Sequence, residues 1–128
     1  MRRHYRPVAE ACASVRRDLR AFLESCGADA EATDVAVLVA NELASNVIDH
    51  AGTPFVVTVT LSAEAVRIEV EDGSGSPPVV RPPDVHAARG RGLQLIEALA
   101  GEWTYVRTAA GKIVCADVPA ARAPLRTA

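Results

Sequence analysis

The spacing of hydrophobic residues in the first part of the chain predicts two consecutive helices. Apolar residues recur every three or four positions over Val8–Cys26, which is the spacing of one buried helix face. Gly27 follows, where a helix end often requires a left-handed residue. A second series with this spacing covers Ala30–Ala51, and Gly52 and Pro54 are expected to end that helix.

Beyond Pro54 the pattern changes to the alternation that is typical of strands. Apolar and polar residues alternate over Phe55–Leu61 and again over Val66–Val70, which predicts an antiparallel hairpin with one buried face. Two further strands are expected near the end of the chain, at Trp103–Thr108 and Ile113–Val118, around a turn that contains Gly111.

The segment between the two strand pairs has no sustained periodicity from residue 73 to residue 90. It contains four prolines: Pro77, Pro78, Pro82 and Pro83. An irregular segment of this length is usually a lid, a binding loop or disordered. A short helix is predicted after it, over residues 93–100. The order of elements predicts one α+β domain over residues 1–128, a two-layer sandwich whose mostly antiparallel mixed sheet carries the helices on one face.

Composition narrows the class of protein. The chain has 128 residues, 49% of them hydrophobic, which suffices for the core of one domain. The formal net charge of -2 gives no reason to expect nucleic acid or a membrane surface as a partner. No apolar run approaches the roughly 18 residues of a membrane span, and no apolar stretch follows the N-terminal arginines as in a secretory signal.

Cysteine and arginine usage adds two expectations. Cys12, Cys26 and Cys115 are odd in number and lack metal or redox spacing, which favours reduced thiols in a cytoplasmic protein. Six arginines fall within the first twenty residues: Arg2, Arg3, Arg6, Arg16, Arg17 and Arg20. We interpret them as the solvated face of a helix, because acidic residues are interspersed among them.

A polar stripe on the second predicted helix is the first candidate site. Glu42, Ser45, Asn46 and Asp49 are three or four positions apart and so share a helix face. Such a stripe is commonly the solvated side of an amphipathic helix. Alternatively, Glu42 and Asn46 present a carboxylate and an amide oxygen one turn apart, and hard oxygen ligands suit a magnesium–phosphate site.

Asp72 and the segment around Gly90 are the other candidates. Asp72 ends the second predicted strand, where an aspartate before a glycine often forms a turn. Its carboxylate could instead accept a hydrogen bond from the exocyclic amine of adenine and exclude guanine, which has a carbonyl there. Gly90-Arg91-Gly92-Leu93 opens the third predicted helix, either as an entry turn or as an anion site. His50 has no ligand partner at metal-binding spacing.

Four segments, in this order, together resemble the GHKL ATPases, the superfamily of the histidine-kinase ATPase domain. NELASNVIDHAG (41–52) is similar to the N-box helix, and IEVEDGSG (68–75) to the strand and aspartate of the adenine box. GRGLQLIEALAGEW (90–103) resembles the second glycine box, and GKIVCADVP (111–119) the closing strand. The resemblance covers essentially the whole chain and is strongest to stand-alone anti-sigma-factor serine kinases.

The resemblance implies a Bergerat-type ATPase fold that binds ATP and Mg²⁺. Asn46 would hold the metal, and Glu42 would act as general base toward a substrate serine. Three groups of residues would contact the nucleotide: Asp72 at the adenine, Ser74 and Gly75 in the adenine box, and Gly90, Arg91, Gly92 and Leu93 at the phosphates. The implied partners are an anti-anti-sigma protein of the STAS type, a sigma factor and a second copy of the chain.

Two positions depart from the family pattern and keep an alternative open. Ser74 stands where the adenine box has its first glycine, and Ile113 stands where many relatives have a threonine near the phosphates. These changes favour an alternative hypothesis, in which the domain is a non-catalytic protein-interaction module of the same fold.

Overall fold

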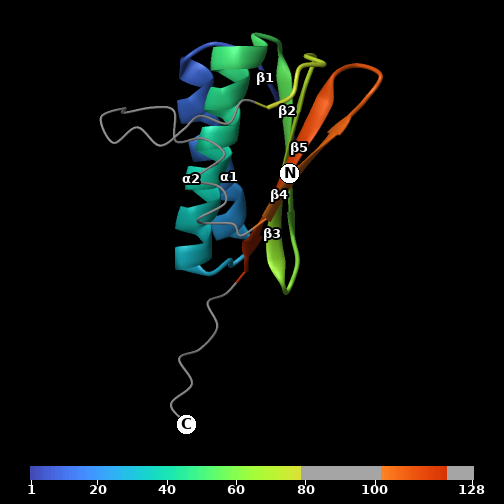
Figure 1. Ribbon diagram of the computed structural model, residues 1–128. Helices are drawn as coiled ribbons and strands as arrows, with labels where there is room; N and C mark the ends of the chain where they lie inside the picture. Colours follow the sequence, from blue (N-terminus) through green and yellow to red (C-terminus); the bar gives the residue numbers. More distant parts are fainter. Residues whose placement is uncertain (79–101, 121–128) are drawn as a thin grey trace, which may run out of the picture.

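The computed structural model describes residues 1–78 and 102–120. It consists of two layers, a sheet and a pair of helices that covers one face of the sheet (Figure 1). The strands are β1 (Arg2–Tyr5), β2 (Phe55–Leu61), β3 (Ala65–Asp72), β4 (Glu102–Arg107) and β5 (Lys112–Pro119); the helices are α1 (Glu10–Ser25) and α2 (Ala30–Asn46), and α2 continues into a π-helical turn, η1 (Val47–Ala51).

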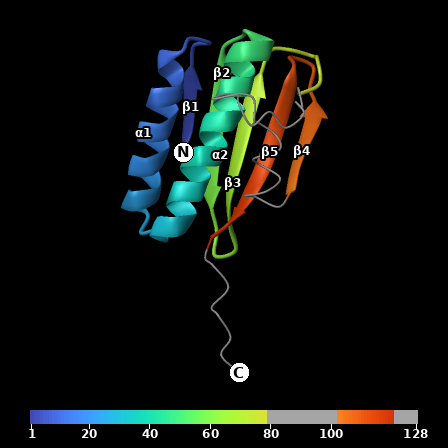
Figure 2. The same ribbon diagram turned by 60° about the vertical axis from the view of Figure 1, so that its left-hand side comes forward.

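The described strands form one sheet in the order β1-β2-β3-β5-β4, and each neighbouring pair is antiparallel. Figure 2 shows this order from β1 beside α1 to the β4–β5 hairpin at the opposite edge. The predicted α+β two-layer sandwich is therefore confirmed. The predicted helix at residues 93–100 and most of the predicted loop 73–90 lie outside the described residues.

Helix α1 begins and ends close to its predicted bounds, and α2 begins as predicted and reaches the predicted end at Ala51 only through η1. The residues of α1 at four-residue spacing are fully buried, as for Val15, Leu19 and Leu23, which is the stripe that the sequence pattern predicts. At the start of α2 the Asp29 carboxylate accepts a hydrogen bond from the Ala32 N–H at 3.0 Å. This cap satisfies one of the N–H groups that a helix start leaves unpaired.

The end of the second predicted helix differs in winding from an α-helix. Over Val47–Ala51 the chain forms the π-helical turn η1, and Gly52 follows with a φ of 65°. The Gly52 N–H donates to the Val47 carbonyl at 2.8 Å. π-helical turns are rare in proteins overall, and those that occur are often found at functional sites. This one lies at the end of the predicted N-box segment.

Strand β1 is absent from the sequence-based prediction. It pairs with β2 at the edge of the sheet, with Tyr5 opposite Phe55. The two rings stack with centroids 5.5 Å apart, and the Tyr5 hydroxyl donates to Asp18 of α1 at 2.9 Å. Burial of the hydroxyl is the main reason that the pKa of Tyr5 is raised above its ordinary range, and the hydrogen bond to Asp18 raises it further.

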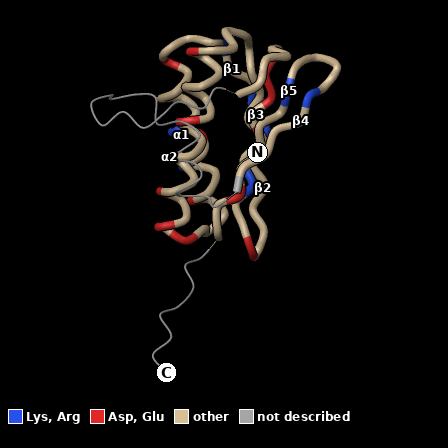
Figure 3. Tube along the Cα trace, viewed as in Figure 1, with Lys and Arg blue, Asp and Glu red and all other residues tan. Residues whose placement is uncertain are grey.

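The N-terminal arginines therefore do not form a single helix face. Arg2 and Arg3 lie on strand β1, whereas Arg16, Arg17 and Arg20 lie on α1 as expected. Charged residues suit an edge strand because they oppose pairing with further strands. Figure 3 shows that acidic and basic residues occur on the strands as well as on the helices.

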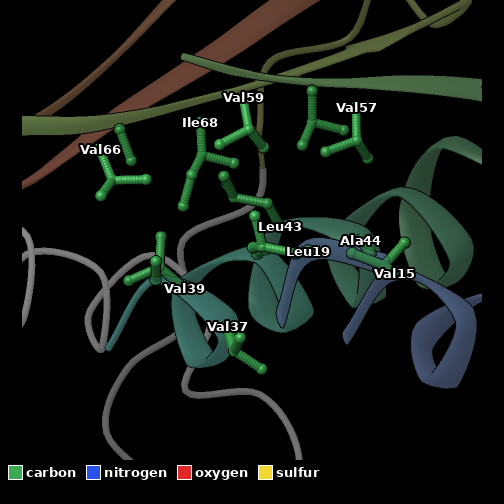
Figure 4. Packing of buried hydrophobic residues seen from close by; sticks show 14 of the residues in the cluster. Val15, Leu19, Val37, Val39, Leu43, Ala44, Val57, Val59, Val66 and Ile68 are labelled. Carbon is green, nitrogen blue, oxygen red and sulfur yellow. The ribbon is translucent and has the colours of Figure 1, made fainter. Parts of the chain in front are cut away.

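The core fills the space between the helix pair and the sheet. Val57, Val59, Val66 and Ile68 point from β2 and β3 toward the helices (Figure 4). Leu43 and Val39 of α2 and Leu19 of α1 meet them from the other side. None of the described helices is both long and apolar enough to cross a bilayer.

Candidate functional site

A pocket lies where the end of α2, the turn η1, the end of β3 and the start of β5 meet. Its apolar wall includes Leu43, Val47, Val70 and Val114. Six polar residues also line it: Asn46, His50, Asp72, Ser74, Ser76 and Lys112. The pocket thus combines an apolar surface with a few polar groups, which is the usual composition of a small-molecule site.

Asp72 is the last residue of β3 and is almost completely buried, with 3% of its surface exposed. Its Oδ1 accepts two hydrogen bonds, from the Lys112 ammonium at 3.0 Å and from the Ser74 N–H at 2.8 Å. Its Oδ2 is also 3.0 Å from the ammonium. However, Oδ2 accepts no hydrogen bond of good geometry from the described residues.

Lys112 is the only lysine of the chain and is as buried as its partner, with 4% exposed. It begins β5, where alternate side chains at positions 112, 114, 116 and 118 face the helices. Lys112 was not among the predicted site residues. The sequence does contain a signal for it, because this lysine occupies an inward position in a strand whose other inward residues are apolar.

Ile113 lies between two residues of that inward row. Strand alternation places its side chain on the sheet face opposite Lys112 and Val114, and it does not line the pocket. Among the described residues of β5, Lys112 is the polar side chain that reaches the predicted adenine-binding aspartate. The position of Ile113 in the sheet therefore gives no support to the expected effect of this residue on phosphate binding.

The turn after Asp72 is held by local hydrogen bonds. The Gly73 N–H donates to Thr53 Oγ1 at 2.8 Å, and the Ser76 N–H donates to Ser74 Oγ at 3.2 Å. The Ser74 carbonyl accepts from the Lys112 ammonium at 3.4 Å. Ser74 therefore lines the pocket while its hydroxyl is used within the turn, and Gly75 is exposed beside it.

Gly111 packs tightly against the backbone of this turn. A Cβ at Gly111 would lie 2.0 Å from the Asp72 carbonyl oxygen and 2.8 Å from the Gly73 backbone. Such contacts are far inside van der Waals distance, so the β4–β5 hairpin can approach β3 here only because position 111 is a glycine. The sequence pattern predicts Gly111 within a turn but does not predict this contact.

Only part of the predicted polar stripe on the second helix lies at the pocket. Asn46, at the end of α2, lines the pocket. Glu42 is half-buried one turn earlier on the same helix face, about 6 Å away along the helix axis. Ser45 instead contacts Cys12 of α1 at 3.5 Å, and Asp49 is exposed.

The structure brings together three of the predicted binding residues, Asn46, Asp72 and Ser74, with Glu42 adjacent. The predicted phosphate-binding residues Gly90, Arg91, Gly92 and Leu93 lie outside the described part of the chain. Within residues 1–78 and 102–120, no group of three or more His, Cys, Asp and Glu side chains is placed to hold a metal ion.

Comparison with known proteins identifies the family. Residues 6–117 match the family described as the histidine kinase-like ATPase domain. The fold is similar to the crystal structure of the RsbU and RsbW domains of Rv1364c from Mycobacterium tuberculosis, with a TM-score of 0.69 and 23% sequence identity. That similarity covers 99% of this chain but 35% of the longer chain.

No match was found among curated proteins. The family match nevertheless extends over most of the sequence and includes α1, α2, β2, β3, β4 and most of β5, whereas β1 precedes it. It confirms the resemblance to the GHKL superfamily and implies nucleotide binding. This protein belongs to the histidine kinase-like ATPase domain family.

Proposed function

We propose that this domain is an anti-sigma-factor-type regulator that binds Mg²⁺–ATP in the pocket and transfers phosphate to a serine of an anti-anti-sigma partner. The observation that carries the proposal is the buried Asp72 carboxylate, which faces a largely apolar pocket and keeps one oxygen without a hydrogen bond from the described residues. A flat, mostly apolar base with one exocyclic amine fits those features.

Asp72 and its neighbours would bind the adenine. The carboxylate accepts hydrogen bonds only, so it suits the adenine amine and opposes the guanine carbonyl. The apolar residues Val70 and Val114 would contact the ring faces. Ser74 would border the base together with Gly75. Phosphate contacts are proposed for Gly90, Arg91, Gly92 and Leu93, on the family resemblance alone.

Asn46 would bind the metal through its side-chain oxygen. Magnesium usually takes one or two protein oxygens and completes its shell with phosphate oxygens and water. A single amide oxygen in the pocket fits that mode. Bound ATP would supply its γ-phosphoryl group to the oxygen of the substrate serine, and ADP would be the leaving group.

Glu42 would be the general base. It lies one turn from Asn46 on the face of α2 that leads into the pocket, so a serine hydroxyl presented there could pass its proton to the Glu42 carboxylate. The protein partners, an anti-anti-sigma protein of the STAS type and a sigma factor, follow from the family resemblance, as do the homodimer and the cytoplasmic location.

Calorimetry of ATP binding with magnesium is the first test. We expect the wild type to bind and Asp72→Asn to bind at least about tenfold more weakly, because the acceptor for the adenine amine is changed. The matched control is Asp117→Asn, which makes the same substitution in an ion pair on the other face of the sheet. Asn46→Ala leaves the Asp72 ion pair intact and should remove the magnesium dependence, because alanine has no side-chain oxygen.

Phosphate transfer is the second step of the same test. Glu42→Gln should retain ATP binding but transfer phosphate to an anti-anti-sigma partner about 100-fold to 10,000-fold more slowly. Glu24→Gln, on the exposed surface of α1, is the control. ATP binding without transfer to any candidate partner would favour the non-catalytic interaction module, whereas absence of ATP binding would refute the proposal.

A further inference from the structure

The two oxygens of the Asp72 carboxylate have different surroundings. Oδ1 receives hydrogen bonds from the Lys112 ammonium and the Ser74 N–H, at 3.0 and 2.8 Å. Oδ2 is buried and lies 3.0 Å from the same ammonium, but it receives no hydrogen bond of good geometry from the described residues. A buried acceptor without a donor costs free energy and is rare in folded proteins. Oδ2 is therefore the position at which a bound ligand can place a donor.

The Ser74 N–H, which donates to Oδ1, contributes to this difference, whereas Lys112 lies 3.0 Å from both oxygens. The Lys112 ammonium contacts three acceptors, the two carboxylate oxygens and the Ser74 carbonyl. It thereby joins the end of β3, the following turn and the start of β5. Two hydrogen bonds hold Oδ1, and Oδ2 keeps acceptor capacity for a ligand in the pocket that Asp72 lines. The ammonium also supplies the counter-charge that a carboxylate requires inside a fold.

We propose that Lys112 is the residue that sets purine specificity: by pairing with Asp72 inside the pocket, it keeps that carboxylate an acceptor-only group whose Oδ2 receives the exocyclic amine of adenine. This inference rests on the proposed nucleotide-binding function. Lys112 acts through Asp72 and is a positioning residue, since its own ammonium is engaged by Asp72 and Ser74.

The chemistry of the carboxyl group explains why the lysine matters for specificity. An ionised carboxylate has no donor and meets the guanine carbonyl with repulsion. Burial without a counter-charge favours the neutral form of a carboxyl group. A neutral carboxyl carries a donor proton, which can satisfy the guanine carbonyl. Loss of the Lys112 charge should therefore reduce discrimination between adenine and guanine.

The ratio of ATP affinity to GTP affinity is the measurement that separates this role from a structural one. A variant that only destabilises the fold lowers both affinities by the same factor, because both nucleotides bind the same folded molecules. We expect wild-type protein to prefer ATP, Lys112→Met to lose at least about tenfold of that preference, and Lys112→Arg to retain it. The control is Arg67→Met, which removes the cation of the cross-strand pair on the opposite sheet face.

The double variant Asp72→Asn, Lys112→Met tests the same point without an unpaired buried charge. An amide both donates and accepts, so this variant should bind the two nucleotides with similar affinities. An unchanged ATP-to-GTP preference in Lys112→Met or in the double variant would overturn the role of Lys112 and leave the proposed nucleotide site standing. Failure of the wild type to bind ATP would overturn both.

A measurement on the wild type keeps the inference testable if the variants do not fold. Because Lys112 is the only lysine, lysine labelled with ¹⁵N gives one side-chain ammonium signal in an NMR spectrum. Mg²⁺–ADP should shift this signal, as the adenine amine binds the carboxylate that the ammonium holds, and Mg²⁺–GDP at equal concentration should not. A signal that ignores both nucleotides while ATP binds by calorimetry would refute the proposal.

Discussion

Strands β3 and β5 carry two ion pairs of similar length on opposite faces of the sheet. Asp72 pairs with Lys112 on the face covered by the helices, and Arg67 pairs with Asp117 on the outer face; each pair joins directly opposed residues. The closest nitrogen–oxygen distances are 3.0 and 2.9 Å. The side chains of the inner pair are 5% and 1% exposed, whereas those of the outer pair are 55% and 42% exposed.

The difference in burial gives the two pairs different consequences. Water and salt screen the outer pair, so its contribution to stability is small. The inner pair is shielded from solvent, and removal of one member leaves a buried charge that nothing neutralises. The distances alone therefore do not indicate which ion pair is important for stability and binding. The inner pair is distinguished by its burial and by the pocket beside it.

The largest effect is expected from Lys112→Met. This change leaves the Asp72 carboxylate buried without its cation and should lower the free energy of unfolding by about 3–5 kcal/mol. Urea denaturation followed by circular dichroism measures the loss. The double variant Asp72→Asn, Lys112→Met should recover most of it, since neither charge then remains. Equal destabilisation by the single and double changes would show that packing, rather than charge, is responsible.

Gly111→Ala should have the next largest effect. The new Cβ would clash with the Asp72 carbonyl oxygen, so the hairpin must move away from the aspartate end of β3, at a cost of about 1–3 kcal/mol. Thermal unfolding measures this cost. Gly75→Ala is the matched control, because a Cβ at Gly75 meets nothing within 4 Å. Comparable losses in the two variants would contradict the role assigned to Gly111.

The smallest effect is expected at the outer pair, from Asp117→Asn. The hydrogen bonds from Arg67 lower the pKa of Asp117 below its model-compound value of 3.8. The ionised carboxylate thus stabilises the fold above pH 4, and this contribution disappears as the pH falls through the lowered pKa. Wild type and variant should differ slightly in melting temperature at neutral pH, and less in high salt or at pH 2. A difference that grows under acid conditions would contradict this sign.

Much of the fold could be predicted because it depends on local patterns. The strand at Phe55–Leu61 has its predicted bounds, and α2 begins at Ala30 as predicted. Strand β1 could not be predicted, because Arg2–Tyr5 has no apolar alternation. It forms through contacts with β2 and α1, of which the Tyr5 contacts with Phe55 and Asp18 are examples.

The candidate site shows the same division. Asn46 and Asp72 were predicted from motifs in a recognisable order, and both line one pocket. Lys112 was missed because its importance comes from a residue forty positions earlier, which β-sheet pairing places directly opposite. Gly111 was assigned to a turn, and only the packing of that turn on Asp72 explains the need for a glycine.

The sequence by itself determined the two amphipathic helices, the alternating strands and the ordered motifs of a histidine kinase-like ATPase domain, since periodicity and motif spacing are properties of neighbouring residues. Only the tertiary structure decided that β1 joins the sheet, that Ile113 faces away from the pocket, and that the single lysine pairs with the predicted adenine-binding aspartate. Each of these depends on which distant segments pair and pack together, and sequence patterns describe only neighbouring residues.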